Sequence, residues 1–359
     1  MIKKSISHFL TLMLFGLLIG CAANKPLEIE RPVSAERDEA GRQLHDAPHA
    51  MDPKMLDELR QSVPKFSQLN NGKIMQFMHV MGPNYTWDLV SDVAGDEDGN
   101  GYGVLLLVHG FREHGDRVFR ERLQPLANSK PTSLALGMSM MTSDHIQLGL
   151  NNLVEAGAHD IIVIPVVSTR HNTMLRQWEY IFSRQATAEY ATVPQVATHA
   201  RVHFLQPLED HPLVGETLVE YAAEISSNPA REEVIIVAHG PVFEPDNQKQ
   251  LAMLQRLADY VAERSKYVGV GAVTLQDDAT LEIRKANVEA LRKRVIDAGA
   301  RGNEVLIITN LLGTRIVQSQ LRKDLRGLQY RFNSKGLIQH DNFIRWIELS
   351  VNETIATSR

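Results

Sequence analysis

Two histidines stand at or just after the ends of apolar segments, and their side chains could bind a metal ion or accept a proton. His109 follows Val-Leu-Leu-Leu-Val at 104–108, and His171 comes four residues after Ile-Ile-Val-Ile-Pro-Val-Val at 161–167. A neutral imidazole is a good ligand for divalent Co, Ni, Fe or Zn, and it accepts protons near neutral pH. His109 and His171 are therefore the candidate catalytic and metal-binding residues. A histidine in such a place can also simply cap a loop, and that alternative stays open.

The segments before these histidines have the pattern of buried parallel strands. The run at 104–108 is apolar throughout, which is typical of a strand covered on both faces of its sheet. The run Val-Ile-Ile-Val-Ala at 234–238 has the same pattern and is followed by His239 and a glycine. Because open α/β sheets bind ligands at the carboxyl ends of their strands, we expect His109 and His171 to face one crevice.

Strands and helices alternate along the chain, which predicts an α/β fold with mainly parallel sheets flanked by helices. The pattern predicts strands at 132–140, 160–167, 201–205, 233–238, 268–275 and 304–309, and helices at 111–127, 143–156, 173–183, 213–226, 248–264, 280–298 and 317–325.

A duplication is visible in the residues at corresponding places. His-Gly occurs at 109–110 and at 239–240, and Gly-Ala precedes an apolar strand at both 157–158 and 299–300. Thr-Arg-His at 169–171 then corresponds to Thr-Arg-Ile at 314–316, so the second half lacks the second histidine. We therefore predict two tandem subdomains, one at 71–200 and one at 201–359.

The amino-terminal segment has the features of a bacterial lipoprotein signal. A short basic start and an apolar run at 9–19 lead into Leu-Ile-Gly-Cys at 18–21, which resembles a lipobox. This pattern predicts a signal peptide at 1–20, lipidation of Cys21 and a polar tether with short helices at 21–70. The protein is then expected in the cell envelope, anchored to a membrane and facing the periplasm. The outer membrane is favoured because no aspartate follows Cys21.

Composition excludes several classes of function. The formal net charge is −5, and no block of Lys and Arg could neutralise phosphates, so nucleic acid is not an expected partner. Cys21 is the only cysteine, so no intramolecular disulfide can form. The chain has no G-x-S-x-G, H-E-x-x-H or P-loop motif, which leaves hydrolase and nucleotide-binding functions without support.

The ordered set of motifs resembles the sirohydrochlorin cobaltochelatase (CbiX-like) family, relatives of the class II chelatases. The set consists of Leu-Leu-Val-His-Gly-Phe-Arg at 106–112, the segment 145–165, His171, Gln-Pro-Leu-Glu-Asp-His-Pro at 206–212 and Val-Ala-His-Gly at 237–240. The resemblance implies two tandem chelatase-like subdomains. It also implies that metal binding and deprotonation of the ring fall on His109 and His171.

The function implied by this resemblance is insertion of Co²⁺, Fe²⁺ or Ni²⁺ into a tetrapyrrole such as sirohydrochlorin, without ATP. Such a reaction needs a loosely held metal and a base, because two pyrrole N–H protons must leave. Arg112 is the candidate for binding the carboxylates of the ring. The alternative is a non-catalytic lipoprotein that binds a divalent metal or a haem-like ring. A structural envelope protein built on the same fold is a third hypothesis.

Overall fold

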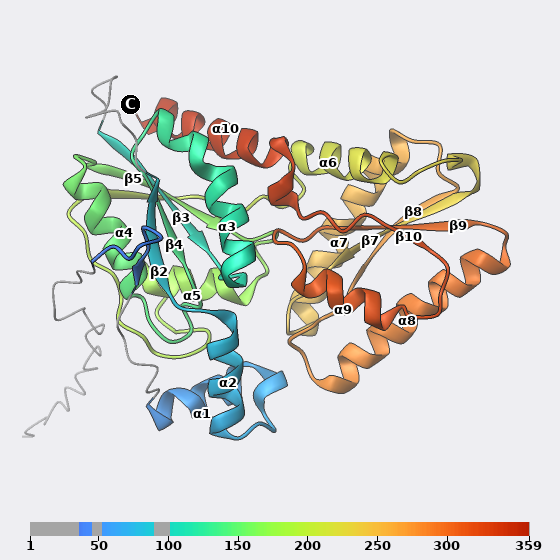
Figure 1. Ribbon diagram of the computed structural model, residues 1–359, viewed down its shortest axis with the longest axis horizontal. Helices are drawn as coiled ribbons and strands as arrows, with labels where there is room; N and C mark the ends of the chain where they lie inside the picture. Colours follow the sequence, from blue (N-terminus) through green and yellow to red (C-terminus); the bar gives the residue numbers. More distant parts are fainter. Residues whose placement is uncertain (1–35, 45–51, 90–100, 359) are drawn as a thin grey trace, which may run out of the picture.

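The two apolar segments that lead into His-Gly lie at the centres of two separate sheets. The computed structural model describes residues 36–44, 52–89 and 101–358. The first segment is β3 (Tyr102–Val108), and the second is β7 (Glu232–Ala238). Figure 1 shows the two sheets in two lobes that lie side by side, with β3 in the left lobe and β7 in the right one. We call these the first and the second lobe.

The sheet of the first lobe has six strands in the order β1-β2-β4-β3-β5-β6. Strands β4, β3, β5 and β6 run parallel, whereas β1 and β2 form an antiparallel edge. The strands other than β3 are β1 (Gln43–Leu44), β2 (Tyr85–Leu89), β4 (Thr132–Leu136), β5 (Asp160–Val166) and β6 (Arg201–Phe204). The central strand β3 thus ends between two parallel neighbours, which places His109 at the carboxyl edge of the sheet.

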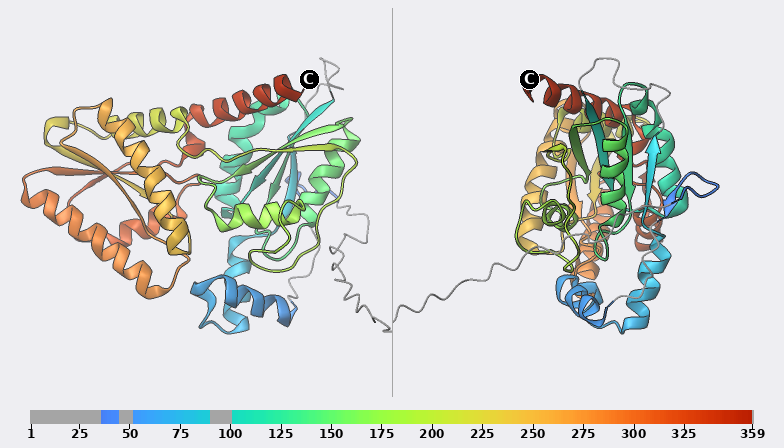
Figure 2. Two further views of the ribbon diagram at one scale, coloured as in Figure 1. Left: turned by 180° about the vertical axis from the view of Figure 1, so that it is seen from behind. Right: turned by 90° about the vertical axis from the view of Figure 1, so that its left-hand side faces the viewer.

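Helices cover both faces of this sheet, as the edge-on view in Figure 2 shows. Leu106 of β3 packs in a hydrophobic cluster with α3 and α10, whereas Leu105 and Leu107 pack in another with α4 and α5. All three leucines are fully buried, as expected for an apolar run without alternation. The helices on the sheet are α3 (Arg112–Leu123), α4 (Asp144–Glu155), α5 (Thr173–Ile181) and α10 (Asp341–Ser358).

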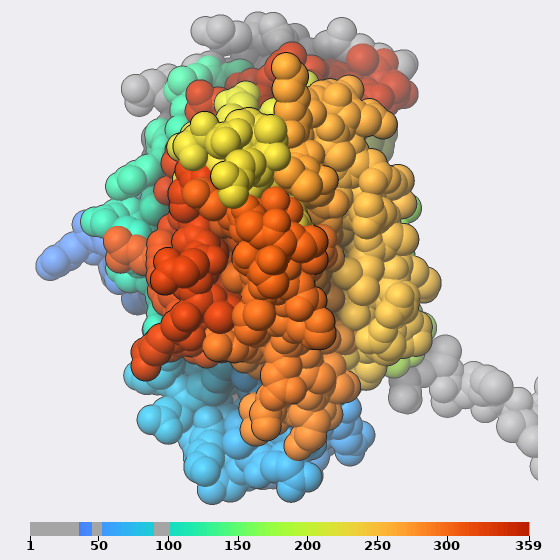
Figure 3. Space-filling model, turned by 90° about the vertical axis from the view of Figure 1, so that its right-hand side faces the viewer, coloured from blue at the N-terminus to red at the C-terminus, as the bar shows by residue number. Residues whose placement is uncertain are grey.

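The sheet of the second lobe has four parallel strands in the order β10-β9-β7-β8. Ile236 of β7 packs in the same cluster as α6 and α7, whereas Ile235 and Val237 pack with α8 and α9. Figure 3 shows the outer side of this lobe. Its elements besides β7 are β8 (Gly269–Thr274), β9 (Glu304–Thr309), β10 (Arg331–Phe332), α6 (Pro212–Ala223), α7 (Glu244–Glu263), α8 (Leu281–Ala300) and α9 (Ile316–Asp324).

The carboxyl-terminal helix α10 returns to the first lobe (Figure 1). Its buried side chains, among them Trp346 and Ile347, belong to the hydrophobic cluster of β3 and β5. At its far end, the Ser358 hydroxyl lies 3.5 Å from Nδ1 of His203 on the edge strand β6. The same hydrophobic cluster includes α6, α7 and β7, so one continuous core joins the two lobes.

The amino-terminal helices dock on the first lobe. They are α1 (Pro53–Ser62) and α2 (Asn71–Met81), with a short 3₁₀ helix, η1 (Pro64–Phe66), between them. Leu59 and Ile74 from α1 and α2 are fully buried in the cluster that includes α5. The other 3₁₀ helices are η2 (Gln124–Asn128), η3 (Pro229–Arg231) and η4 (Leu337–Gln339). Within the described residues, no helix is both long and apolar enough to cross a membrane.

The predicted fold class is confirmed, but the predicted subdomain limits need correction. Strand β6 pairs with β5, so 201–204 belongs to the first sheet and not to the subdomain predicted at 201–359. The end of that range, α10, also packs on the first lobe. Residues 52–70 of the predicted tether at 21–70 are largely helical and contribute buried side chains to the first lobe. The predicted signal peptide at 1–20 lies outside the described residues.

Candidate functional site

His109 directly follows β3. The loop that begins with it is fixed by a hydrogen bond to the buried carboxylate of Asp116. The backbone N–H of Phe111 donates a hydrogen bond of 2.6 Å to Oδ1 of Asp116, in the second turn of α3. Tyr85 donates to Oδ2 of the same carboxylate at 3.1 Å, and Arg120 donates to the Tyr85 hydroxyl at 2.9 Å. Asp116 is only 3% exposed, and burial raises its pKa to about 6 despite these donors. The loop of His109 is therefore positioned by a titratable group.

His239 follows β7 and lies beside a carboxylate from the next strand of its sheet. Its Nε2 is 3.5 Å from Oδ2 of Asp278, in the loop after β8, and its Nδ1 is 3.0 Å from the oxygen of Gly240. The backbone explains this placement, because the N–H of Asp277 donates to the oxygen of His239 at 3.4 Å. The side chains of His239 and Asp278 are 40% and 37% exposed, so both are accessible to a ligand.

Lys65 links the amino-terminal helices to this carboxylate. Its Nζ lies 3.1 Å from Oδ1 of Asp278, and its backbone N–H donates to the oxygen of Asp278 at 3.3 Å. The same ammonium lies 5.2 Å from the centre of the Phe77 ring of α2. Asp278 therefore receives one cation from the first part of the chain and one imidazole from its own lobe.

The pKa shifts show that His109 and His239 share one electrostatic environment. Burial lowers the pKa of His109, and the positive charge of His239 lowers it further, while Asp278 acts in the opposite direction. Burial also opposes charging of His239, but the carboxylates of Asp278 and Asp277 outweigh it and raise the pKa of His239. We call His109, His239, Asp278 and Lys65 the inter-lobe site. It pairs an imidazole that stays neutral with one that takes up a proton readily.

His171, the other predicted site residue, lies among different groups. It follows β5, and its backbone N–H donates to Oγ1 of Thr169 at 3.2 Å. Burial lowers the pKa of His171, while the carboxylates of Glu209 and Asp246 raise it in part. Among the described residues, no contact joins His171 to His109, so their convergence on one crevice stays a prediction.

The two remaining predicted residues are placed as follows. Arg112 is exposed at the start of α3, and its backbone has a φ of 61°. Cys21 lies outside the described residues. Within residues 36–44, 52–89 and 101–358, no three His, Cys, Asp or Glu side chains are grouped as a ready-made metal centre.

Sequence reasoning did not assign His239, Asp278 or Lys65 to the site. The signal for His239 was present, because its His-Gly repeats that of His109. Asp278 lies in the loop before α8 and does not cap this helix, because the hydroxyl oxygen of Thr280 accepts from the backbone N–H of Ile283 at 3.4 Å. No local pattern indicates Lys65, which is distant in sequence from its partner.

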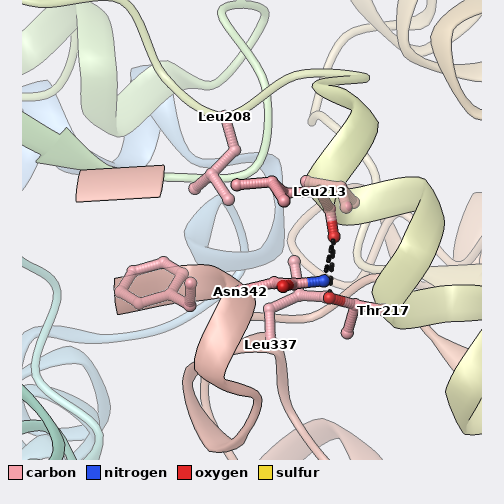
Figure 4. Close-up of a pocket in the computed structure, with 7 residues that line it drawn as sticks. Leu208, Leu213, Thr217, Leu337 and Asn342 are labelled. Carbon is pink, nitrogen blue, oxygen red and sulfur yellow. Dashed lines mark hydrogen bonds between the residues drawn. The ribbon is translucent and has the colours of Figure 1, made fainter. Parts of the chain in front are cut away.

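A small apolar pocket lies elsewhere, between α6 and the start of α10 (Figure 4). Its lining consists of Leu208, Leu213, Val214, Thr217, Leu337, Asn342 and Phe343. The amide of Asn342 donates to the oxygen of Leu213 at 3.2 Å, so a polar group of the lining is already bonded. The pocket contains no titratable side chain, and we interpret it as a packing feature of the joint between the lobes.

Comparison with known proteins identifies the fold. No family model and no curated protein matches this chain. Among solved structures, SirB from Bacillus subtilis, determined with Fe³⁺, is similar over 72% of this chain and 96% of its own, with 16% identity and a TM-score of 0.53. The fold is chelatase-like. This confirms the architecture that the motif resemblance implied.

A second solved structure is a multi-domain protein from Deinococcus radiodurans. It is described as similar to chelatases, with two additional novel domains. The identity is 18%, the match covers 67% of this chain, and the TM-score is 0.42. This chain spans about half of that protein, 52% of its length.

Proposed function

We propose that this protein is an ATP-independent chelatase that inserts divalent Co, Fe or Ni into a tetrapyrrole such as sirohydrochlorin. The observation that carries the proposal is the inter-lobe site, where His109 and His239 influence each other's charge and Asp278 influences both. A chelatase needs a metal ligand and a proton acceptor on one substrate, and two imidazoles with opposite pKa shifts supply both.

Each residue of the site has a distinct task in this proposal. His109, neutral at physiological pH, offers a lone pair to the incoming metal substrate. His239 accepts a pyrrole proton, and the carboxylate of Asp278 stabilises the imidazolium that forms. The second pyrrole proton passes to another base or to water, so that one divalent metal enters as two protons leave. His171, near Glu209 and Asp246, assists by supplying further proton-accepting capacity.

The similarity to SirB supports iron as one of the three metals proposed above. SirB was solved with Fe³⁺, and this chain shares its fold. We therefore place Fe²⁺ beside Co²⁺ among the first metals to be tested.

The direct test is an insertion assay with the full-length protein in detergent. Sirohydrochlorin is mixed with Co²⁺, Fe²⁺ or Ni²⁺ under anaerobic conditions, and the absorbance of the metallated ring is followed. We expect insertion with at least one metal to be faster than the spontaneous reaction, and His109→Ala to remove most of the acceleration. A rate equal to the spontaneous one with all three metals would exclude the chelatase proposal.

A non-catalytic carrier of metal or of a haem-like ring is the second candidate. It is favoured by the presence of Ile316 where the first half has His171. Equilibrium binding of Co²⁺ or haem that depends on His109, without acceleration of insertion, would support the carrier.

We also propose export and lipid anchoring at Cys21 to an envelope membrane, with the body facing the periplasm. The support is the signal-like sequence at 1–21. Mass spectrometry of the amino-terminal peptide from a membrane fraction should show a diacylglycerol on Cys21, and Cys21→Ala should prevent it. An unmodified peptide that still begins at Met1 would contradict the proposal.

A further inference from the structure

Arg315, in the loop between β9 and α9, has an unusual backbone conformation. Its φ and ψ are 79° and −50°, and the N–H of Ile316 donates to the oxygen of Thr314 at 3.2 Å. These angles and this bond define the rare γ-turn with positive φ, with Arg315 at its apex. A residue with a Cβ is strained in this region, so the surrounding structure must hold it there.

The surrounding structure does hold this loop. The N–H of Leu337 donates to the oxygen of Leu311 at 2.8 Å, and the amide of Gln318 donates to the oxygen of Gly313 at 2.8 Å. Gly336 packs so closely against the backbone of Leu312 and Gly313 that a Cβ there would lie 2.4 Å from the oxygen of Gly313. The position of Arg315 is therefore determined by its neighbours and is not the result of a loose loop.

The loop of Arg315 touches the loop that carries Arg112. A Cβ added to Gly313 would lie 2.5 Å from a ring carbon of Phe111, so the two loops meet across the joint between the lobes. Arg112 also has a positive φ, of 61°. Both arginines are exposed, and neither guanidinium has a hydrogen-bond or ion-pair partner among the described residues. By contrast, Arg120 and Arg122 of α3 are both paired with carboxylates.

Unmet hydrogen-bonding groups lie in the same loop. Both side-chain atoms of Asn310 and the hydroxyl of Thr314 are buried without a hydrogen-bond partner in the described part of the chain. These residues are only 1% and 8% exposed. Because burying such groups without partners is unfavourable, they indicate a loop shaped for polar contacts that the protein alone does not supply.

We infer that Arg112 and Arg315, together with the Asn310–Thr314 loop, form a subsite for the carboxylates of a polycarboxylate macrocycle. The inference rests on the proposed function and specifies its substrate class. A guanidinium binds a carboxylate through two parallel hydrogen bonds, and the two arginines belong to loops of opposite lobes that meet where Gly313 contacts Phe111. A ring bearing several acetate or propionate groups can engage both, while its centre stays at the inter-lobe site.

The test uses metal-free rings, so that it does not depend on insertion. Binding of uroporphyrin I, with eight carboxylates, and of mesoporphyrin, with two, is measured by quenching of tryptophan fluorescence. We expect Arg315→Gln and Arg112→Gln each to weaken uroporphyrin binding about tenfold, the size of one lost charged hydrogen bond. Mesoporphyrin binding should change less. Arg326→Gln is the matched control, because Arg326 is exposed beyond the other end of α9.

A glycine variant separates binding from folding. Glycine adopts positive φ without strain, so Arg315→Gly should keep or raise the melting temperature and still lose about tenfold in uroporphyrin affinity. Unchanged affinity in Arg315→Gly, equal losses in Arg326→Gln, or no uroporphyrin binding by the unmodified protein would each overturn the inference. Arginine-dependent binding without insertion would leave the subsite standing while excluding the chelatase proposal.

Discussion

The two lobes use the same His-Gly turn after a central strand, but they place the two imidazoles in different charge environments. Beside β3, the neighbouring strand β4 leads into Gly137, whose N–H donates to the oxygen of Val108 at 3.0 Å, and residues 137–143 include no carboxylate. Beside β7, the neighbouring strand β8 leads into Asp277 and Asp278. The pKa is accordingly lowered for His109 and raised for His239. The strand-end position is thus shared, and the adjacent loop decides the protonation state.

The largest expected effect comes from removing each imidazole. His109→Ala and His239→Ala should each slow metal insertion roughly 100-fold or more, the usual range for a lost acid–base group. His109→Ala should weaken metal binding, whereas His239→Ala should mainly alter the pH dependence of the rate. His159→Ala is the control, since the His159 side chain is 71% exposed and precedes β5, at the opposite edge of the sheet from His109. If all three substitutions slowed insertion equally, the proposed roles of His109 in metal binding and of His239 in proton acceptance would be excluded.

The next largest effect is on the pH dependence of stability, and it comes from Asp116, which fixes the His109 loop. The pKa of Asp116 is raised to about 6 from 3.8, so the folded state binds its proton more tightly than the unfolded chain. Its contribution to stability is therefore greatest below pH 4 and falls by roughly 3 kcal/mol as the pH rises to 7. Urea unfolding of the unmodified protein and of Asp116→Asn across this range should show the difference. A difference that does not vary with pH would contradict the assignment.

A smaller effect is expected where the lobes touch. Gly313→Ala would place a Cβ against the Phe111 ring and should destabilise the protein by about 1–3 kcal/mol. Gly299→Ala in α8 meets nothing within 4 Å and should be neutral or slightly stabilising. Thermal unfolding of both variants measures this. Similar melting temperatures for the two would mean that the contact between the loops does not form in solution.

The smallest expected effect is on the pKa values of the two histidines. It comes from changing Asp278, the carboxylate beside His239, and it tests the difference between the two lobes most directly. Asp278→Asn should lower the pKa of both histidines, because the carboxylate of Asp278 raises the pKa of His109 and is the first of the groups that raise the pKa of His239. Lys65→Ala should raise the pKa of His239, since the ammonium opposes its charge. NMR titration of the histidine ring signals reports both changes. If His109 titrates at higher pH than His239 in the unmodified protein, the proposed difference between the two histidines would be wrong.

Strands and helix ends that have a clear local sequence pattern were predicted correctly from the sequence. The apolar runs at 104–108 and 234–238 are buried strands, and Gly157 ends α4 with a φ of 92°. Strand β6 was assigned to the wrong sheet, because a short and partly exposed strand does not indicate its partner. The return of α10 to the first lobe was missed for the same reason: its apolar face does not specify which sheet it covers.

The site was predicted only in part. His109 was found because its chemistry and its strand lie together in the sequence. The environment of His239 was not, because it depends on Asp278 and on Lys65, which are brought together by tertiary contacts. Arg315 corresponds to Arg170 in the sequence repeat, but Arg170 is paired with Glu209. Only the structure distinguishes the free arginine from the paired one.

Because the last helix lies on the lobe that is synthesised first, that lobe cannot finish folding while the chain is still emerging from the ribosome. Part of its hydrophobic face stays open to water until α10 (Asp341–Ser358) has been made. Loss of the final turns of α10 would leave both lobes made but the first one incomplete.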